Sequence, residues 1–170
     1  RALAYSILDE ALVAHVGIST ERGPVVLPMT YGRIHDRLYL HGAVGNALLR
    51  AGTDVSICAT VTLLDGLVLA RSAFHHSMNY RSVVVVGTAT EITDPVEKLR
   101  ALDAIVEHVA PGRGASVRPP SENELRATRV VTLPLDEASA KARTGPPKDD
   151  EADYALPVWA GEIPLGLQPG

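Results

Sequence analysis

Cysteine and long apolar runs are both scarce in this chain. Cys58 is the only cysteine among 170 residues, so no disulfide can form within the chain. A lone cysteine fits a protein kept in a reducing compartment, and we therefore expect a cytoplasmic location. No apolar run approaches the roughly 18 residues that a membrane-spanning helix needs. The sequence thus predicts no membrane partner.

Basic charge is also in deficit. The chain has 16 lysines and arginines against 20 aspartates and glutamates, which gives a net charge of −4 at pH 7. A domain that binds nucleic acid usually carries a basic stripe, so a nucleic-acid partner is not expected. Hydrophobic residues nevertheless make up 46% of the chain, which is enough for a folded domain with a sizeable core.

Several familiar site motifs are missing. The chain has no H-E-x-x-H and no C-x-x-C, and the adjacent His75 and His76 would point to opposite faces of a strand. We therefore expect no dedicated metal site. No G-x-G-x-x-G follows a predicted strand, and neither a Walker lysine nor a G-x-S-x-G elbow is present. Their absence argues against a classical dinucleotide site, a P-loop and a hydrolase-type serine nucleophile.

Short alternating apolar segments separated by tight turns are abundant, and they are typical of an antiparallel meander. The expected strands cover residues 11–19, 25–34, 38–41, 54–63, 67–72, 80–92 and 130–135. Asp65-Gly66 is expected to be the hairpin turn between the fourth and fifth strands. Pro28 lacks a backbone donor, which places its strand at an edge or at a bulge. Residues 138–144 fit either an extension of the last strand or a helical turn.

Helices are expected at residues 4–10, 42–52 and 95–110 and after Ser121, where Glu124 completes a capping box. Asp94 and Pro95 form the start of the long helix. Its expected buried stripe is Val96, Leu99, Leu102, Ile105, Val106 and Val109. Together these elements predict a β-rich α+β domain over residues 1–145, closed as a barrel. A Pro-rich, acidic extension over residues 146–170 is expected to dock on the same domain.

One polar cluster runs directly into an apolar strand. Residues 74–82 hold imidazoles, hydroxyls, an amide and a guanidinium, and Val83 to Val86 follow them. The four valines are apolar on both faces of a strand, so both faces should be covered. Arg71, Arg81 and the helix start after His41 offer donors suited to a phosphate. The structural alternatives are ion pairs on an exposed edge and an ordinary strand-to-helix connection.

Four runs carry a resemblance to a known family: residues 38–43, 63–83, 137–141 and 157–161. They resemble the pyridoxamine 5′-phosphate oxidase-like family, and more narrowly its flavin-nucleotide-binding, nitroimidazole-reductase-like branch. The resemblance implies an FMN-binding split β-barrel of about six to seven antiparallel strands with two or three peripheral helices. It also implies a homodimer with flavin sites at the subunit interface.

The resemblance assigns candidate cofactor contacts in three segments. The second strand would run along the isoalloxazine ring. Residues 41–43 and the helix start through Asn46 would meet the phosphate, and residues 79–82 would add phosphate or ring contacts from the same or the other subunit. Where many relatives carry Lys, Arg or Ser, this chain has Gly45, Asn46 and Ala47, which shifts the phosphate charge towards Arg81. With Arg71 as a further donor, the candidate contacts are Met29, Thr30, Tyr31, His41, Gly42, Ala43, Asn46, Arg71, Asn79, Tyr80, Arg81 and Ser82.

The function that follows from the resemblance is an FMN-dependent oxidoreductase acting on a small unidentified substrate. His41 and His76 are the candidate catalytic residues near the substrate, with a structural hydrogen bond as the alternative role of each. Basic residues on the substrate side of the vitamin B6 oxidases find no match in this chain, so that activity is not expected. Two other functions stay open: a flavin- or haem-binding protein without turnover, and a deazaflavin-dependent reductase on the same barrel.

Overall fold

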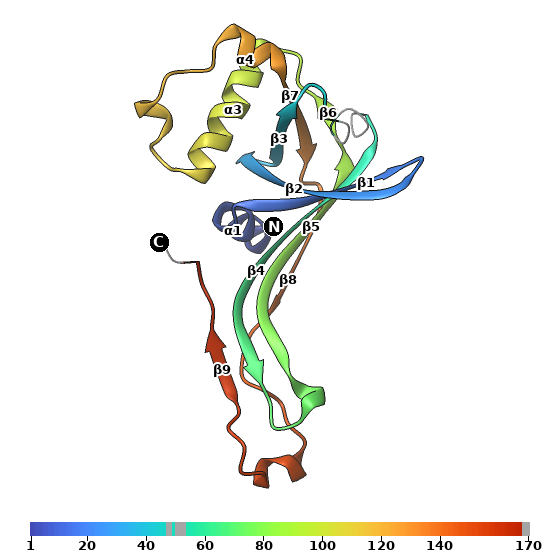
Figure 1. Cartoon of the computed structure of the whole chain (residues 1–170), viewed down its shortest axis with the longest axis vertical. Helices are drawn as coiled ribbons and strands as arrows, with labels where there is room; N and C mark the ends of the chain where they lie inside the picture. The colour runs from blue at the N-terminus through green and yellow to red at the C-terminus, as the bar shows by residue number, and fades with distance from the viewer. Residues whose placement is uncertain (47–48, 50–53, 168–170) are drawn as a thin grey trace.

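The computed structural model describes residues 1–46, 49 and 54–167 (Figure 1). Its helices are α1 (Ala2–Glu10), α3 (Pro95–Val109) and α4 (Glu122–Ala127), with short 3₁₀ turns η1 (Ala73–His75), η2 (Gly114–Ser116) and η3 (Glu151–Ala155). Its strands are β1 (Val13–Thr20), β2 (Gly23–Ile34), β3 (Arg37–Ala43), β4 (Ser56–Leu69), β5 (Ser77–Thr88), β6 (Thr90–Glu91), β7 (Thr128–Pro134), β8 (Glu137–Arg143) and β9 (Gly161–Pro164).

The strands form one curled antiparallel sheet in the order β6-β7-β3-β2-β1-β4-β5-β8, and β9 pairs with β4. The predicted β-rich α+β class is confirmed, with nine strands in the described ranges against the expected six or seven. Residues 138–143 belong to β8, so they extend the sheet and do not form a helical turn. Pro28 pairs with His15 of β1, and β3 pairs with β2 only from Tyr31 onward, so Pro28 does lie on a free edge.

The prediction of a hairpin turn at Asp65-Gly66 is wrong. β4 continues past a bulge between Leu64 and Gly66, and the chain turns back only at η1. The reason is long-range pairing, because β5 lies on one side of this segment and β9 lies on the other. A Cβ on Gly66 would lie 3.0 Å from the Ile163 carbonyl oxygen, so glycine allows β9 to approach. β4, β5, β8 and β9 thus make a long arm that extends away from α3 (Figure 1).

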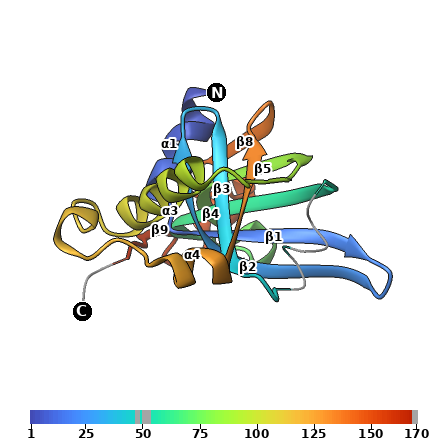
Figure 2. The same cartoon turned by 90° about the horizontal axis from the view of Figure 1, so that it is seen from above.

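Helix α3 packs on β2 and β3 at the opposite end of the molecule from this arm (Figure 1). Gly32 makes the approach possible, since a Cβ there would lie 2.7 Å from the Ala104 carbonyl carbon. Seen from above, the β1–β2 hairpin projects from one side of the molecule and the loop after α3 from the other (Figure 2). The start of α3 is capped as predicted, because the Asp94 side chain accepts the Glu97 N–H at 2.9 Å.

The predicted buried stripe of α3 is mostly wrong. Ile105 is buried and Leu102 is partly buried, but Val96 is 74% exposed and Leu99, Val106 and Val109 are also exposed. Ala101, outside the stripe, is fully buried. The residues of α3 nearest to Gly32 are Ala104 and Ile105, so the helix faces the sheet with a narrower apolar stripe than the sequence pattern predicts.

The four valines of β5 are covered on one face only within this chain. Val83 and Val85 are fully buried, whereas Val84 and Val86 are 37% and 39% exposed. In the C-terminal segment β9 pairs with β4, and Trp159 is mostly exposed. The domain boundary near residue 145 stays a prediction. The short helix expected within residues 42–52 lies largely outside the described residues. In the described ranges, no helix is long and apolar enough to cross a membrane.

Candidate functional site

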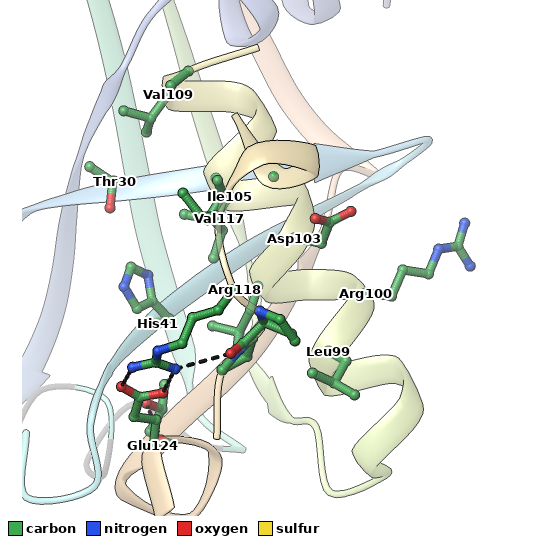
Figure 3. A pocket seen from close by; sticks show the side chains of 17 residues that line it. Thr30, His41, Leu99, Arg100, Asp103, Ile105, Val109, Val117, Arg118 and Glu124 are labelled. Atoms are coloured by element: carbon green, nitrogen blue, oxygen red, sulfur yellow. Dashed lines mark hydrogen bonds and ion pairs between the residues drawn. The ribbon is translucent and has the colours of Figure 1, made fainter. Parts of the chain in front are cut away.

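A cavity of about 1090 Å³ lies between α3, the loop that follows it, α4 and one face of the β2–β3–β7 sheet (Figure 3). The sheet supplies its polar floor, and α3 with the loop supplies an aliphatic wall. It is lined by Thr30, His41, Leu99, Arg100, Leu102, Asp103, Ile105, Val106, Val109, Ala110, Gly114, Val117, Arg118, Pro119, Pro120, Glu124 and Thr128.

His41 enters this cavity because of its register in β3. Side chains alternate along a strand, so Tyr39 and His41 face α3 while Leu38 and Leu40 face the main core. Its Nδ1 atom is buried and has no hydrogen-bond partner among the described residues. Burial lowers the pKa of His41, which keeps the imidazole neutral at physiological pH. A neutral imidazole with a free nitrogen is a ligand or a proton acceptor.

The residues that the resemblance assigned to the isoalloxazine ring lie on both faces of β2. Thr30 lines the cavity beside His41, whereas Met29 and Tyr31 are buried in the main core. The Tyr31 hydroxyl lies 2.7 Å from the Leu8 carbonyl oxygen and 2.8 Å from that of Ala11. Burial raises the pKa of Tyr31 well above its usual range. Tyr31 therefore has a structural role in this chain.

Gly42, next to His41, faces Asn46 and Leu49, neither of which lines the cavity. A Cβ on Gly42 would lie 2.8 Å from Leu49 Cδ1 and 3.1 Å from Asn46 Nδ2, so the chain folds closely over this glycine. Asn46 Oδ1 accepts the Leu49 N–H at 3.3 Å. Ala43 pairs with Thr128 at the end of β3. Of the residues predicted to meet the phosphate, His41 therefore enters the cavity, Gly42 and Asn46 lie away from it, and Ala43 lies beside the cavity-lining Thr128.

Arg81 lies on the arm and is already paired with two carboxylates. Its guanidinium donates to Asp65 at 2.7 and 2.9 Å and to both carboxylate oxygens of Glu10. These bonds hold the pKa of Glu10 and of Asp65 below their ordinary values. Ser82 on β5 pairs with Lys141 on the neighbouring strand β8. The Lys141 ammonium lies 6.0 Å from the centre of the Tyr80 ring.

Arg71 and Asn79 hold the C-terminal segment rather than an open site. Asp149 accepts the Arg71 backbone N–H at 2.8 Å and its guanidinium at 2.9 Å. Asn79 is buried; its side chain donates to Glu162 and accepts a 2.5 Å bond from Arg143. Arg71 and Arg81 therefore carry the ion pairs that the structural alternative predicted.

His76 is at the tip of the arm, with Nδ1 2.9 Å from the Ser72 carbonyl oxygen. The neighbouring His75 gathers with Asp150 and Asp153, with one possible ligand atom from each within 4.8 Å of the others. Exposed acidic groups often gather in this way without an ion, and the expectation of no dedicated metal site stays a prediction. The two candidate catalytic histidines are not brought together within one chain, because His41 lies in the cavity and His76 on the arm.

The sequence pattern indicated the floor of the cavity but not its wall. Arg118 lies on the loop between α3 and α4, and its guanidinium donates to both carboxylate oxygens of Glu124 at 2.7 and 2.8 Å. Arg100 also lines the cavity but points outward (Figure 3). The sequence does contain an indication of this wall. Residues 99–109 include more apolar side chains than one buried helix face can accommodate, so some of them must lie elsewhere.

Residues 1–142 match the protein family described as pyridoxamine 5′-phosphate oxidase. The chain belongs to this family. Its structural relatives include the flavocytochrome Anf3 from Azotobacter vinelandii, at 44% identity and a TM-score of 0.93, over 99% of this chain and 79% of that one. They also include an FAD- and haem-binding protein from Mycobacterium smegmatis, at 37% identity and a TM-score of 0.94, over 100% and 84% of the two chains.

A third relative is a putative 5-nitroimidazole antibiotic resistance protein from Bacteroides thetaiotaomicron. It is 28% identical with a TM-score of 0.68, over 82% of each chain. No curated protein matches the chain. The close superpositions confirm the predicted family and its split-barrel fold.

Proposed function

We propose that this protein is a flavin- and haem-binding redox protein. The observation that carries the proposal is the cavity under α3, which combines an aliphatic wall with one neutral imidazole. Such surroundings suit haem, because its macrocycle is flat and apolar and histidine is one of the residues that hold haem iron in proteins. When bound, a flavin supplies hydride transfer and a haem supplies one-electron chemistry. The two relatives at 44% and 37% identity, a flavocytochrome and an FAD- and haem-binding protein, support this reading.

The flavin in this proposal is FAD rather than the FMN expected from the sequence. The support is the M. smegmatis relative, which binds FAD and aligns along this whole chain. The expected phosphate donors give FMN no support within one chain, since Arg71 and Arg81 are both paired with carboxylates. An oxidoreductase activity on a small substrate remains part of the proposal.

We place the flavin at the interface of a homodimer. One chain leaves an apolar surface exposed to solvent. This surface includes Val84 and Val86 on β5 and Phe74 on the arm, and contiguous exposed apolar surface is typical of an interface. A second copy laid against this face would also bring an arm with His76, Asn79 and Arg81 towards the partner. The arrangement explains why the candidate flavin contacts are divided between two ends of one chain.

The experiment is a cofactor analysis of the purified full chain. Bound flavin is released by denaturation and identified by chromatography against FAD, FMN and deazaflavin standards, and the intact protein is titrated with haem while the Soret band is followed. We expect FAD and one haem per chain. Deazaflavin or FMN in place of FAD would overturn the flavin assignment. A folded protein that takes up neither cofactor would overturn the proposal as a whole.

A further inference from the structure

The cavity under α3 offers one protein ligand to a metal-bearing cofactor. Among its described lining residues, His41 is the only imidazole, and no cysteine, methionine or tyrosine accompanies it. The buried Nδ1 of its ring has no hydrogen-bond partner among the described residues. The other ring nitrogen, Nε2, is not among the buried side-chain atoms without a partner, and it is the nitrogen left for a molecule in the cavity. An unprotonated imidazole nitrogen facing an apolar space is suited to bind iron.

The wall opposite His41 is apolar and incompletely covered. Leu99, Val106, Val109 and Val117 line the cavity and are nevertheless exposed in this chain. Contact with an apolar ring would remove this surface from water, which is favourable in proportion to the area buried. Pro119 and Pro120 stiffen the end of the same wall, because proline fixes its backbone angle. The cavity is thus adapted to a flat hydrophobic molecule.

Two of the described arginines line this cavity, and Arg118 is the one that does not point outward (Figure 3). Its side chain is 70% exposed and is held by Glu124 alone among the described carboxylates, so the pair is weak and exchangeable. Glu124 has a second partner, the Ser121 N–H at 2.7 Å, and remains hydrogen-bonded when Arg118 leaves. In Figure 3 the Arg118 guanidinium lies on the same side of the cavity as His41. A carboxylate on a bound ligand can therefore take the place of Glu124.

We infer that haem binds in this cavity with His41 as its axial ligand and with a propionate carboxylate on Arg118. This inference rests on the proposed function and assigns the two residues that fix the cofactor. In this arrangement His41 would hold the iron, Arg118 would bind a propionate, and the aliphatic residues of α3 would contact the macrocycle.

The first test is a haem titration of the full chain carrying His41→Gly, followed by added imidazole. We expect His41→Gly to bind haem at least about tenfold more weakly than wild type, in line with the loss of a metal ligand. Added imidazole should restore the wild-type Soret position, since it can fill the space left by the side chain. His15→Gly is the matched control, because His15 is exposed on β1 and does not line the cavity. Wild-type affinity and an unchanged spectrum in His41→Gly would overturn the assignment.

The second test addresses Arg118 and uses haem and its dimethyl ester, which lacks the free carboxylates. Arg118→Gln should weaken haem binding about threefold to tenfold, as expected for one charge-assisted bond, and should leave ester binding unchanged. Arg126→Gln is the control, because Arg126 forms a similar exposed pair with Glu122 on α4 and lies outside the cavity lining. If Arg118→Gln weakens the binding of haem and of the ester equally, Arg118 does not bind a propionate.

The two tests separate this inference from the proposed function. If wild-type protein takes up no haem, both fail together. If wild type takes up haem and neither variant alters the binding, the protein remains a haem protein, and its haem lies outside the cavity under α3. Circular dichroism of each variant establishes that it is folded before its titration is interpreted.

Discussion

Asp149 is bonded to both the backbone N–H and the guanidinium of Arg71, 78 residues earlier in the chain. The Arg71 guanidinium carbon also lies 5.2 Å from the centre of the Tyr154 ring. These contacts attach the segment before β9 to the tip of the arm. The Arg71 Nε atom is buried there and has no hydrogen-bond partner among the described residues. The C-terminal segment thus depends on a few polar contacts and on four β9 residue pairs.

We predict that Asp149→Ala loosens this segment without unfolding the barrel. Limited proteolysis should cleave within residues 150–160 several times faster than in wild type, because local opening becomes easier. The midpoint of global unfolding should change less than the cleavage rate, because the bonds that Asp149 accepts join this segment to Arg71 and not to the main core. Asp150→Ala is the control, since the Asp150 side chain makes no capping bond to η3. Equal cleavage rates in the two variants would contradict the prediction.

The pairing of Arg81 with Glu10 and Asp65 predicts a pH-dependent contribution to stability. Both carboxyl groups have a lowered pKa in the folded chain, mainly through their hydrogen bonds to Arg81. Their contribution is therefore complete above the unfolded pKa values of about 4 and is lost as the pH falls through the lower folded values. Arg81→Met should cost about 1 kcal/mol at pH 7, because the groups are partly exposed.

The measurement is urea unfolding of wild type and Arg81→Met at pH 7 and at about pH 3, where the difference between them should shrink. Arg126→Met serves as the control, because its pair with Glu122 is highly exposed and should contribute little at either pH. A difference that grows towards low pH would show that Arg81 acts in another way.

Local rules predicted the elements that local contacts stabilise. The Asp94 cap and the Ser121–Glu124 capping box both form as the sequence indicates. The turn expected at Asp65-Gly66 fails because β9, about 100 residues later, pairs with this segment and holds it in a strand. Pairing between distant segments overrides a dipeptide's turn preference, and no local pattern contains that information.

The candidate site was predictable to a similar extent. His41 was singled out and does line the cavity, together with Thr30. Arg118 was missed because its position depends on how α3 crosses the sheet, and that crossing depends on the close contact between Gly32 and Ala104. Arg71 and Arg81 have the chemistry of phosphate donors, but two of the carboxylates that pair with them, Asp149 and Glu10, lie 78 and 71 residues away in the sequence.

Gly32→Ala should destabilise the protein and impair the cavity. The added Cβ would lie 2.7 Å from backbone atoms of Ala104 and Ile105, so α3 must move away from β2. Overpacking of this kind costs about 1–3 kcal/mol, and urea unfolding should report a loss in that range. Gly45→Ala is the control, because a Cβ there meets nothing within 4 Å. Haem affinity should fall in Gly32→Ala and stay at the wild-type value in Gly45→Ala.

The exposed valines of β5 give a direct test of the proposed homodimer. Val84→Glu and Val86→Glu place a charge on the uncovered face, where it would be buried without a partner if two copies meet there. Sedimentation at micromolar concentration should show a dimer for wild type and a monomer for the double variant, with bound flavin lost at the same time. Val96→Glu is the matched control, since Val96 is an exposed apolar residue on α3 and not on this face. Haem uptake by the monomeric variant separates the two cofactor sites, because the cavity under α3 is formed within one chain. If the double variant stays a dimer with bound flavin, the flavin interface lies elsewhere on the barrel.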